Sequence, residues 1–409
     1  MTTISLIVPV YNAERFLTQC LNSALSQTLQ SIEIICVDDC SVDNSFGILN
    51  AFSERDHRVV VLKNRKNSGL SFSRNRGLKH ATGEYVFFLD ADDYIENRTL
   101  EILYDIITRE KLDVLGFNYD QVFEDAHYKK GRRGHTVGNI FVIEEVTTGK
   151  DLFCKFANKN VVAMMSWMYL YSRDFLLKEK LSFKEGILHE DNLFYFETMM
   201  KASRVRTISN ILYHYRRHAS SITLSSDNLT NAIDSLCYIL YLIGIRLECE
   251  SDRNVQQAIS YYMISISRSI LNKYQNIDAL PKGFEFKYKE SRAILGMCKS
   301  GLYRGFYLNK LSPDEMKIIR ESKLVIIYGA GETGMGLQEL LMERGISVDY
   351  FAVSDIRMVE KERRAYTIDQ LAEKSDEAVV LIASIMNSDE MKCNALKLGF
   401  KNVIVPQYF

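Results

Sequence analysis

Short apolar segments alternate with helix-like stretches over the first hundred residues, and this alternation limits the fold more than any other feature. The apolar segments cover residues 5–10, 32–37, 59–62 and 85–89. Segments that are apolar nearly throughout are typical of parallel strands that helices cover on both faces. The helix-like stretches between them cover residues 13–27, 45–54 and 71–80. The pattern predicts an α/β fold with a parallel sheet and right-handed crossovers.

Polar residues directly follow three of the four apolar segments. They are Tyr11 and Asn12, then Asp38 and Asp39, and finally residues 90–93. In an open α/β sheet, ligands bind at the carboxyl ends of the strands. We therefore expect the functional site at this edge of the sheet.

Residues 90–93 (DADD), called here the DADD turn, contain three carboxylates in four positions. Neighbouring carboxylates repel each other and raise each other's pKa unless a cation is present. Mg²⁺ and Mn²⁺ typically take one or two carboxylates together with substrate phosphates and water. The turn therefore favours a site for a metal-bound diphosphate. A solvated acidic turn is the alternative, because Asp is common in turns.

Four motifs occur in order and carry a resemblance to a known family. They are VPVYN at 8–12, VDDCSVD at 37–43, NSGLSFSRNRG at 67–77 and LDADD at 89–93. Together they resemble the family 2 glycosyltransferases, and the resemblance covers residues 1–225. It implies the GT-A fold, in which a nucleotide-binding α/β sheet is joined to an acceptor-binding half.

The resemblance also implies roles for single residues. Asp39 would bind the nucleobase, most often uracil, and Asp90 would lie near the ribose and the sugar. Asp92 would ligate the Mn²⁺ or Mg²⁺ that bridges the diphosphate. The other residues expected in the nucleotide-sugar pocket are Pro9, Tyr11, Glu14, Arg74 and Asp93. By its chemistry Arg74 suits either a phosphate or the orientation of an Asp, and Asp93 would hydrogen-bond the donor sugar.

The general base is expected on the acceptor side, away from the metal. The family inverts the anomeric centre in one displacement, in which a carboxylate takes the proton of the acceptor hydroxyl. It also places an acidic pair roughly a hundred residues after the DADD turn. Here that pair is Glu190 and Asp191, which we call the acidic pair. Asp191 is the expected base, and Glu190 would contact the acceptor or the base. Ordinary helix capping is the alternative.

Residues 213–223 (YHYRRHASSIT) resemble a segment that many bacterial members carry after the acidic pair. Arg216 or His218 would contact the diphosphate as it leaves, unless these side chains only satisfy a helix end. The processive polysaccharide synthases of the family carry a Gln-x-x-Arg-Trp motif, which this sequence lacks. Its one tryptophan, Trp167, stands elsewhere. The sequence therefore favours transfer of a single sugar.

A second strand–helix–strand pattern begins at Lys323, with strands expected at 323–328, 348–353, 379–383 and 402–405 and a helix at 334–344. Residues 328–334 (YGAGETG) fit a dinucleotide-binding motif, and Asp355 stands where an acid would bind the ribose. The motif glycines are Gly329, Gly331 and Gly334. The pattern predicts a small Rossmann-like domain, which is similar to domains fused to sugar-modifying proteins of bacterial surface polysaccharide pathways. NAD(P) binding is one interpretation, and a tethering, dimerising or regulatory role is the other.

Composition excludes several classes of protein. Fifty-one Lys+Arg against 52 Asp+Glu do not fit a nucleic-acid-binding protein. Eight cysteines without a C-x-x-C pair do not fit a secreted disulfide scaffold. The first residues lack the features of a signal peptide, and the longest apolar run, 236–245, is shorter than the ~20 residues of a membrane helix. We therefore expect a cytoplasmic protein. The basic segment 128–135 is either solvated or docks on the inner membrane face.

Together these features predict three regions: a glycosyltransferase domain at 1–225, a helical connector at 226–320 and the Rossmann-like domain at 321–409. The expected function is metal-dependent transfer of a sugar from a UDP-linked nucleotide sugar to a saccharide or lipid-linked acceptor in capsule or lipopolysaccharide synthesis. An NAD(P)-dependent oxidoreductase and a non-catalytic nucleotide-sugar-binding protein are the alternatives. Peripheral membrane contact and a homodimer remain open.

Overall fold

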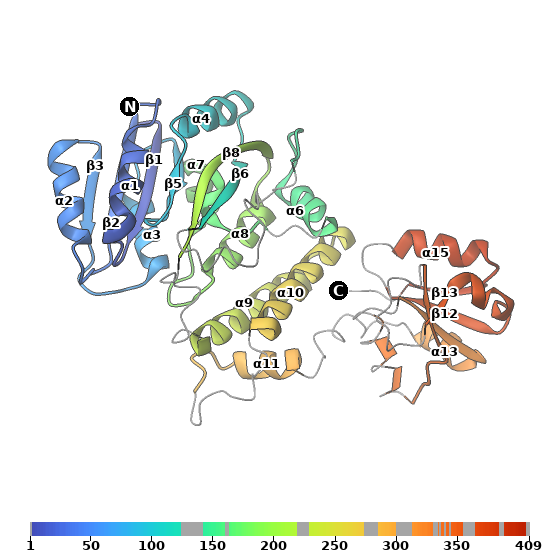
Figure 1. Ribbon diagram of the computed structural model, residues 1–409. Helices are drawn as coiled ribbons and strands as arrows, with labels where there is room; N and C mark the ends of the chain where they lie inside the picture. Colours follow the sequence, from blue (N-terminus) through green and yellow to red (C-terminus); the bar gives the residue numbers. More distant parts are fainter. Residues whose placement is uncertain are drawn as a thin grey trace. The chain divides into compact units, whose positions relative to one another are not determined.

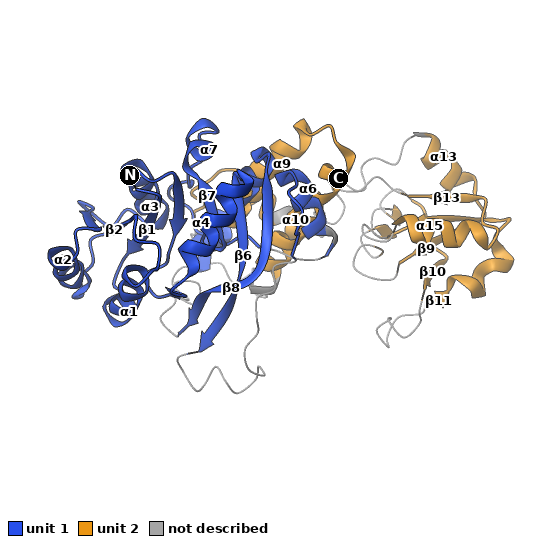
Figure 2. Cartoon of the chain, turned by 90° about the horizontal axis from the view of Figure 1, so that it is seen from above, with its two compact units in different colours: residues 1–235 blue, residues 236–409 orange. Residues whose placement is uncertain are grey.

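The computed structural model separates the chain into two compact units, residues 1–235 and 236–409 (Figure 2). It describes residues 2–123, 142–159, 163–218, 229–273, 285–299, 313–329, 334, 337–338, 341–342, 345–354, 365–383 and 388–405. The first unit contains an eight-stranded mixed sheet with its helices, and the second contains further helices and a five-stranded parallel sheet (Figure 1).

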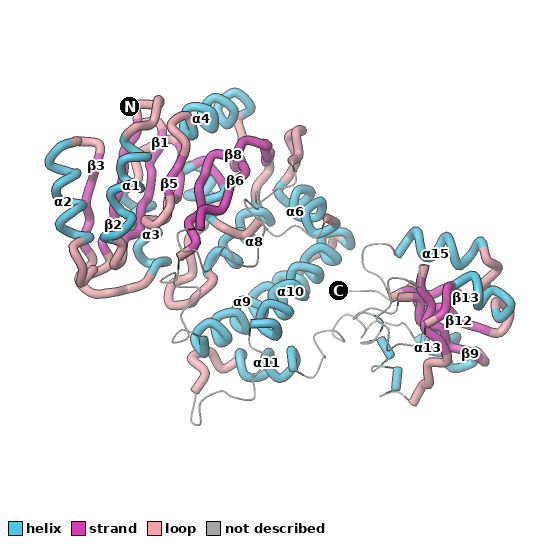
Figure 3. The backbone as a smooth tube through the Cα atoms, viewed as in Figure 1, coloured by secondary structure: helices cyan, strands magenta, loops and turns pink. Residues whose placement is uncertain are grey.

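The first sheet has the strand order β3-β2-β1-β4-β7-β6-β8-β5 (Figure 3). Its first four strands are parallel and are β1 (Ile4–Val10), β2 (Ile32–Asp38), β3 (Val59–Lys63) and β4 (Tyr85–Phe88). All seven residues of β1 are buried, because strands lie on both of its sides and α3 packs against it. The predicted α/β fold with parallel strands is therefore confirmed.

The remaining strands continue the sheet and reverse its direction. They are β5 (Tyr94–Ile95), β6 (Val114–Phe123), β7 (Tyr169–Ser172) and β8 (Val205–Arg217). β7 is antiparallel to both β4 and β6, while β6 and β8 run parallel. β5 follows the DADD turn directly and pairs antiparallel with β8. β8 therefore reaches from β6 to the strand that follows the DADD turn.

Seven helices of the first unit connect and cover these strands in the described part of the chain. They are α1 (Glu14–Leu25), α2 (Ser45–Arg55), α3 (Leu70–His80), α4 (Thr99–Glu110), α6 (Gly149–Asn158), α7 (Arg173–Lys178) and α8 (Glu190–Lys201). A short 3₁₀ helix, η1 (Ser166–Met168), precedes β7. The first three helices form where the sequence predicts them, with ends shifted by at most two residues.

The second unit begins within a helical region and ends in a parallel sheet. Its helices are α9 (Leu229–Cys249, which starts in the first unit), α10 (Arg253–Lys273), α11 (Ser291–Lys299), α13 (Pro313–Glu321) and α15 (Ser388–Lys397), with a 3₁₀ segment η7 (Ile368–Lys374). Its strands are β9 (Leu324–Tyr328), β10 (Tyr350–Val353), β11 (Tyr366–Thr367), β12 (Ala378–Ile382) and β13 (Asn402–Ile404). The predicted division into three regions stays a prediction.

Core clusters lie on both faces of the second sheet, which explains why its central strands β9 and β12 are apolar. Val325 and Ile327 of β9 belong to one core cluster, while Ile326 and Tyr328 belong to another. The strand order is β11-β10-β9-β12-β13, the order found in doubly wound nucleotide-binding sheets. The assignment of a Rossmann-like domain is compatible with this order and stays a prediction.

The predicted nucleotide motif of this unit is described only in part. Gly329 has φ +126°, and a Cβ there would meet the carbonyl oxygen of Ala383 at 2.5 Å. A Cβ on Gly334 would collide with the carbonyl oxygen of Gly329. Both glycines are thus required by close backbone packing. Gly331 and Asp355 lie outside the described residues, so NAD(P) binding stays a prediction.

Two sequence features bear on membrane association: the apolar helices and the basic segment 128–135. None of the helices that the structure describes is both long and apolar enough to cross a membrane. The basic segment 128–135 lies outside the described residues.

Two glycines in helices have opposite surroundings and predict opposite changes in stability. A Cβ on Gly149, the first residue of α6, would collide with the carbonyl oxygen of Met199 in α8. Gly149→Ala should therefore lower the free energy of unfolding by about 1–3 kcal/mol. Gly244 lies inside α9 with Met263 Cε at 3.6 Å as the nearest atom, so Gly244→Ala should raise it by about 0.5–1 kcal/mol. Urea denaturation followed by circular dichroism measures both, and equal effects would contradict the packing at Gly149.

Candidate active site

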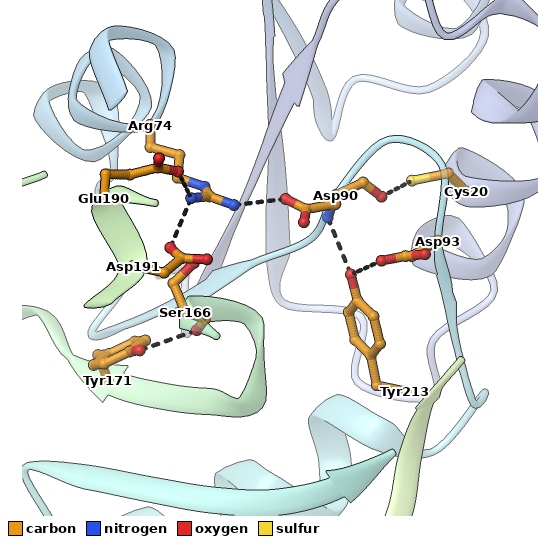
Figure 4. A network of polar contacts seen from close by, with 9 residues as sticks. All are labelled: Cys20, Arg74, Asp90, Asp93, Ser166, Tyr171, Glu190, Asp191 and Tyr213. Atoms are coloured by element: carbon orange, nitrogen blue, oxygen red, sulfur yellow. Dashed lines mark hydrogen bonds and ion pairs between the residues drawn. The ribbon is translucent and has the colours of Figure 1, made fainter. Parts of the chain in front are cut away.

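A single buried arginine joins the two acidic motifs that the sequence predicts (Figure 4). Arg74, on α3, is 1% exposed. Its Nη2 donates a hydrogen bond to Asp90 Oδ1 at 2.8 Å. Its Nη1 donates to Glu190 Oε1 at 2.8 Å and to Asp191 Oδ1 at 2.9 Å. We call these four residues the Arg74 cluster. It brings the DADD turn and the acidic pair into one site.

The start of α8 presents the acidic pair to Arg74. His189 precedes the helix with φ 61°, a left-handed conformation that is uncommon for a residue other than glycine. Glu190 and Asp191 then occupy the first turn of the helix. Acidic residues in the first turn of a helix interact favourably with the helix dipole, which agrees with the alternative interpretation of the pair as ordinary capping residues. Their ion pairs with Arg74 show that they also belong to a tertiary cluster.

The electrostatics of the Arg74 cluster favour a further cation or a retained proton. Three carboxylates share one guanidinium within 2.9 Å. Burial raises the pKa of Glu190 to about 7, and the charge of Asp191 acts in the same direction while Arg74 opposes both. Burial also raises the pKa of Asp90, against the effect of Arg74. Glu190 is 7% exposed and Asp191 is 19% exposed, so Asp191 is the more accessible of the pair.

Asp93 has a different environment from its neighbours in the DADD turn. It is 0% exposed. The Tyr213 hydroxyl donates to its Oδ2 at 2.7 Å, and the backbone N–H of Arg216 donates to its Oδ1 at 2.7 Å. Through these two bonds Asp93 fastens the turn to β8. Its predicted hydrogen bond to the donor sugar stays a prediction.

Tyr213 and Trp167 support the DADD turn from below, a role that no sequence signal indicates. The Tyr213 hydroxyl accepts a hydrogen bond from the backbone N–H of Asp90 at 3.3 Å while it donates to Asp93. The ring of Tyr213 stacks on Trp167, with centroids 4.2 Å apart and planes 9° from parallel. Trp167 lies in η1, so its contact with β8 arises only from the tertiary fold.

Asp92 is the most accessible carboxylate of the turn, at 33% side-chain exposure. Its Oδ2 lies 3.0 Å from His218 Nε2, and its carbonyl oxygen accepts a 2.7 Å bond from Arg216 Nε. Arg216 also donates to Gln19 Oε1 at 2.9 Å. The structure therefore brings both predicted diphosphate contacts to Asp92. Their contact with a leaving diphosphate stays a prediction.

A metal at this site would be held by Asp92 together with the donor. A partly exposed carboxylate fits the preference of Mg²⁺ and Mn²⁺ for oxygen ligands. Within the described ranges, no group of three or more His, Cys, Asp or Glu side chains is arranged to enclose an ion. Because Mg²⁺ commonly uses one or two carboxylates plus substrate phosphates, such an enclosure is not needed.

On the nucleotide side, Asp39 already holds a loop. Its Oδ1 accepts from Asn64 Nδ2 at 2.6 Å and from the Ser68 backbone N–H at 2.9 Å, and its Oδ2 accepts from the Gly69 N–H at 2.7 Å. A carboxylate has about four acceptor positions, so one remains for a ligand. The predicted contact between Asp39 and a nucleobase stays a prediction.

The other predicted pocket residues lie at the same edge of the sheet. Pro9 is buried in β1, and Tyr11 just beyond it is exposed. Glu14 starts α1, and its Oε2 accepts a 2.8 Å bond from the Asn44 backbone N–H. Their contact with a nucleotide also stays a prediction.

The chain has clear similarity to known glycosyltransferases. The model of "Glycosyl transferase family 2" matches residues 5–176. The "Uncharacterized glycosyltransferase EpsJ" of Bacillus subtilis strain 168 is 34% identical over 261 residues, which cover 62% of this chain and 74% of EpsJ. The "Glycosyltransferase GlyA" of Streptococcus pneumoniae serotype 4 is 33% identical over 231 residues, which cover 54% of this chain but only 31% of GlyA.

A solved structure supports the same fold. TarS residues 1–349 from S. aureus, in complex with UDP-GlcNAc, match with a TM-score of 0.58 and 20% sequence identity. The match covers 84% of this chain and 93% of that one. At this identity the likeness concerns the fold, and it confirms the predicted GT-A fold.

The hydroxyl of Tyr213 predicts a measurable loss of stability on its removal. Tyr213→Phe keeps the stacked ring but leaves the buried Asp93 Oδ2 without its donor. The free energy of unfolding should fall by about 1–3 kcal/mol. The control is Tyr104→Phe on α4, whose ring is partly exposed and which should change stability by less than about 0.5 kcal/mol. Urea denaturation compares the two, and a Tyr213 effect no larger than the control would contradict this role.

Proposed function

Because this chain belongs to glycosyl transferase family 2, a family of sugar-transferring enzymes, we propose that it moves a single sugar from a nucleotide sugar to an acceptor hydroxyl with inversion. The observation that carries the proposal is the Arg74 cluster, where a DADD-turn carboxylate and the acidic pair meet at one guanidinium. The donor side and the acceptor side of such a reaction need these two motifs within one site.

In the proposed reaction, Asp191 is the general base. The acceptor oxygen forms a bond to the anomeric carbon while the bond from that carbon to the diphosphate oxygen breaks. The acceptor proton passes to the Asp191 carboxylate, and the nucleoside diphosphate leaves with the electron pair. Asp191 suits this role better than Glu190, because its side chain is the more exposed of the two.

We assign the diphosphate end of the donor to Asp92, Arg216 and His218. Asp92 would hold Mn²⁺ or Mg²⁺, which stabilises the charge that develops on the leaving diphosphate. Arg216 and His218 lie beside Asp92 and would contribute positive charge or hydrogen bonds there. Asp39 and the loop residues around it would bind the nucleobase of the donor.

We propose a UDP-sugar as donor and a saccharide or lipid-linked saccharide of a bacterial surface polysaccharide as acceptor. A complex of TarS with UDP-GlcNAc supports the donor class, since the same fold holds a UDP-sugar in that protein. The reaction would take place in the cytoplasm, where bacteria keep nucleotide sugars. Membership of the family disfavours the alternative function, an oxidoreductase that binds NAD(P) through residues 328–334.

The base assignment predicts a selective loss of turnover. Asp191→Asn should lower kcat by about 100-fold or more, because the amide cannot take the proton. UDP affinity in the presence of Mn²⁺ should stay within about threefold of the original value, because Asp191 is placed on the acceptor side. Asp174→Asn is the matched control, since Asp174 is an exposed acid in the first turn of α7. Near-full turnover in Asp191→Asn would show that another group is the base.

The donor and metal assignments predict cation-dependent binding of UDP. Calorimetry should detect UDP binding with Mn²⁺ and lose it on addition of EDTA. Asp92→Asn should weaken that binding by about tenfold or more, while Asp174→Asn should not. Release of UDP from a panel of UDP-sugars would then identify the donor. Binding of NAD(P)H without UDP binding would favour the oxidoreductase, and UDP binding without any UDP release would favour a non-catalytic protein.

A further inference from the structure

The Arg74 cluster divides three carboxylates between two nitrogens of one guanidinium. Nη2 contacts Asp90 on the donor side, and Nη1 contacts both members of the acidic pair on the acceptor side. We propose that Arg74 is a positioning residue that holds the Asp191 carboxylate in one orientation, offsets the negative charge of the acidic pair and ties the pair to Asp90. This inference rests on the proposed role of Asp191 as the general base. It adds Arg74 as the residue that positions that base.

The guanidinium is held rigidly enough for such a role. Its carbon lies 5.0 Å from the centroid of the Phe183 ring. The next residue, Asn75, fastens the same segment: its Nδ2 donates to the Phe183 carbonyl oxygen at 2.8 Å, and its Oδ1 accepts from the Phe183 N–H at 2.9 Å. The planar fork of an arginine can serve two directions at once, whereas a lysine ammonium is a point charge without a fixed plane.

A direct contact between Arg74 and a donor phosphate does not fit this geometry. Arg74 is 1% exposed, and its two terminal nitrogens already donate to three carboxylates. A phosphate would have to displace one of these partners from a buried position. Of the two roles that suit an arginine in this motif, the orientation of an Asp is therefore the one that the contacts support.

Electrostatics explain why the acidic pair would depend on Arg74. A buried carboxylate surrounded by like charges favours its protonated form, and a protonated carboxyl cannot accept the proton of an acceptor. The charged and titratable groups that face the acidic pair are Arg74 from α3, Asp90 from the DADD turn and Tyr171 from β7. Arg74 is the cation of this set. Even with it in place, burial raises the pKa of Glu190 to about 7.

This environment has a defined effect on stability against pH. The pKa of Glu190 is higher in the folded chain than the ordinary glutamate value of the unfolded chain, so the folded state holds more protons over the interval between them. Stability from this group therefore falls as pH rises through that interval, up to about pH 7. Removal of Arg74 should enlarge the effect, because it takes away the charge that opposes protonation of the pair.

The test compares Arg74→Met and Arg74→Lys with a matched control, Arg58→Met. Arg58 is a partly buried arginine whose side chain pairs with Asp56 at 2.8 Å and hydrogen-bonds to Gln30 and to the Leu25 carbonyl oxygen, none of which belongs to the Arg74 cluster. Two measurements are made over a range of pH on the full chain: the Tm, which needs no substrate, and kcat/KM for transfer. UDP affinity with Mn²⁺ is measured by calorimetry.

For Arg74→Met we expect the Tm difference from the original chain to grow by at least about twofold between about pH 5 and pH 8. The acidic limb of kcat/KM should move up by about one pH unit or more, with a loss of about tenfold near pH 7 that is partly recovered near pH 9. For Arg74→Lys, the Tm difference and the acidic limb should lie between those of the original chain and those of Arg74→Met. The UDP affinity of both variants should stay within about threefold of the original value. Arg58→Met should change neither pH dependence. Because Arg74→Met could fold poorly, Arg74→Met/Glu190→Gln, which also removes one negative charge, should narrow the Tm difference.

A Tm difference that is the same at all pH values, with an unmoved acidic limb, would overturn the inference and leave only a packing role. A fall of UDP affinity of about tenfold or more with an unmoved limb would also overturn it, in favour of a phosphate contact. Absence of transfer by the original chain with every donor would contradict the proposed function. In that case the Tm comparison still decides whether Arg74 controls the ionisation of the acidic pair.

Discussion

The active site depends on ion pairs that form only when the chain is folded. Arg74 lies 116 residues before Glu190 in the sequence, and yet the two side chains are in direct contact. Taking charges out of water costs several kcal/mol per ion, and only close pairing offsets that cost. The packing of α3 against the start of α8 and the DADD turn therefore has to be accurate. Errors there would disturb donor-side and acceptor-side chemistry together.

The fold gives three adjacent acidic residues three different environments. Asp90 pairs with Arg74, Asp92 keeps the largest exposed fraction, and Asp93 is buried under β8. Environments that separate neighbouring carboxylates allow each to carry out a different task. β8 makes this separation possible, because it runs beside the turn and supplies both donors to Asp93. The fold thus gives three neighbouring aspartates of one motif three different chemical environments.

Local signals in the sequence predict the elements but not their partners. The apolar runs locate β1, β2, β3 and β4, and the first three helices end within two residues of the predicted bounds, because periodicity and turn residues are properties of short segments. The motifs likewise single out Asp90 and the acidic pair, which the structure brings together at Arg74. The burial of Asp93 and the stacking of Trp167 on Tyr213 depend on contacts between distant segments, and no short segment encodes them.

The stacked pair of Trp167 and Tyr213 has a practical consequence for spectroscopy. Trp167 is the single tryptophan of the chain, so all indole emission comes from one position. Its ring lies against the tyrosine whose hydroxyl contacts both Asp90 and Asp93. Indole emission from the unlabelled protein therefore reports on the surroundings of Trp167, which include the tyrosine that contacts the carboxylate turn, and it offers an optical signal for events there without any introduced probe.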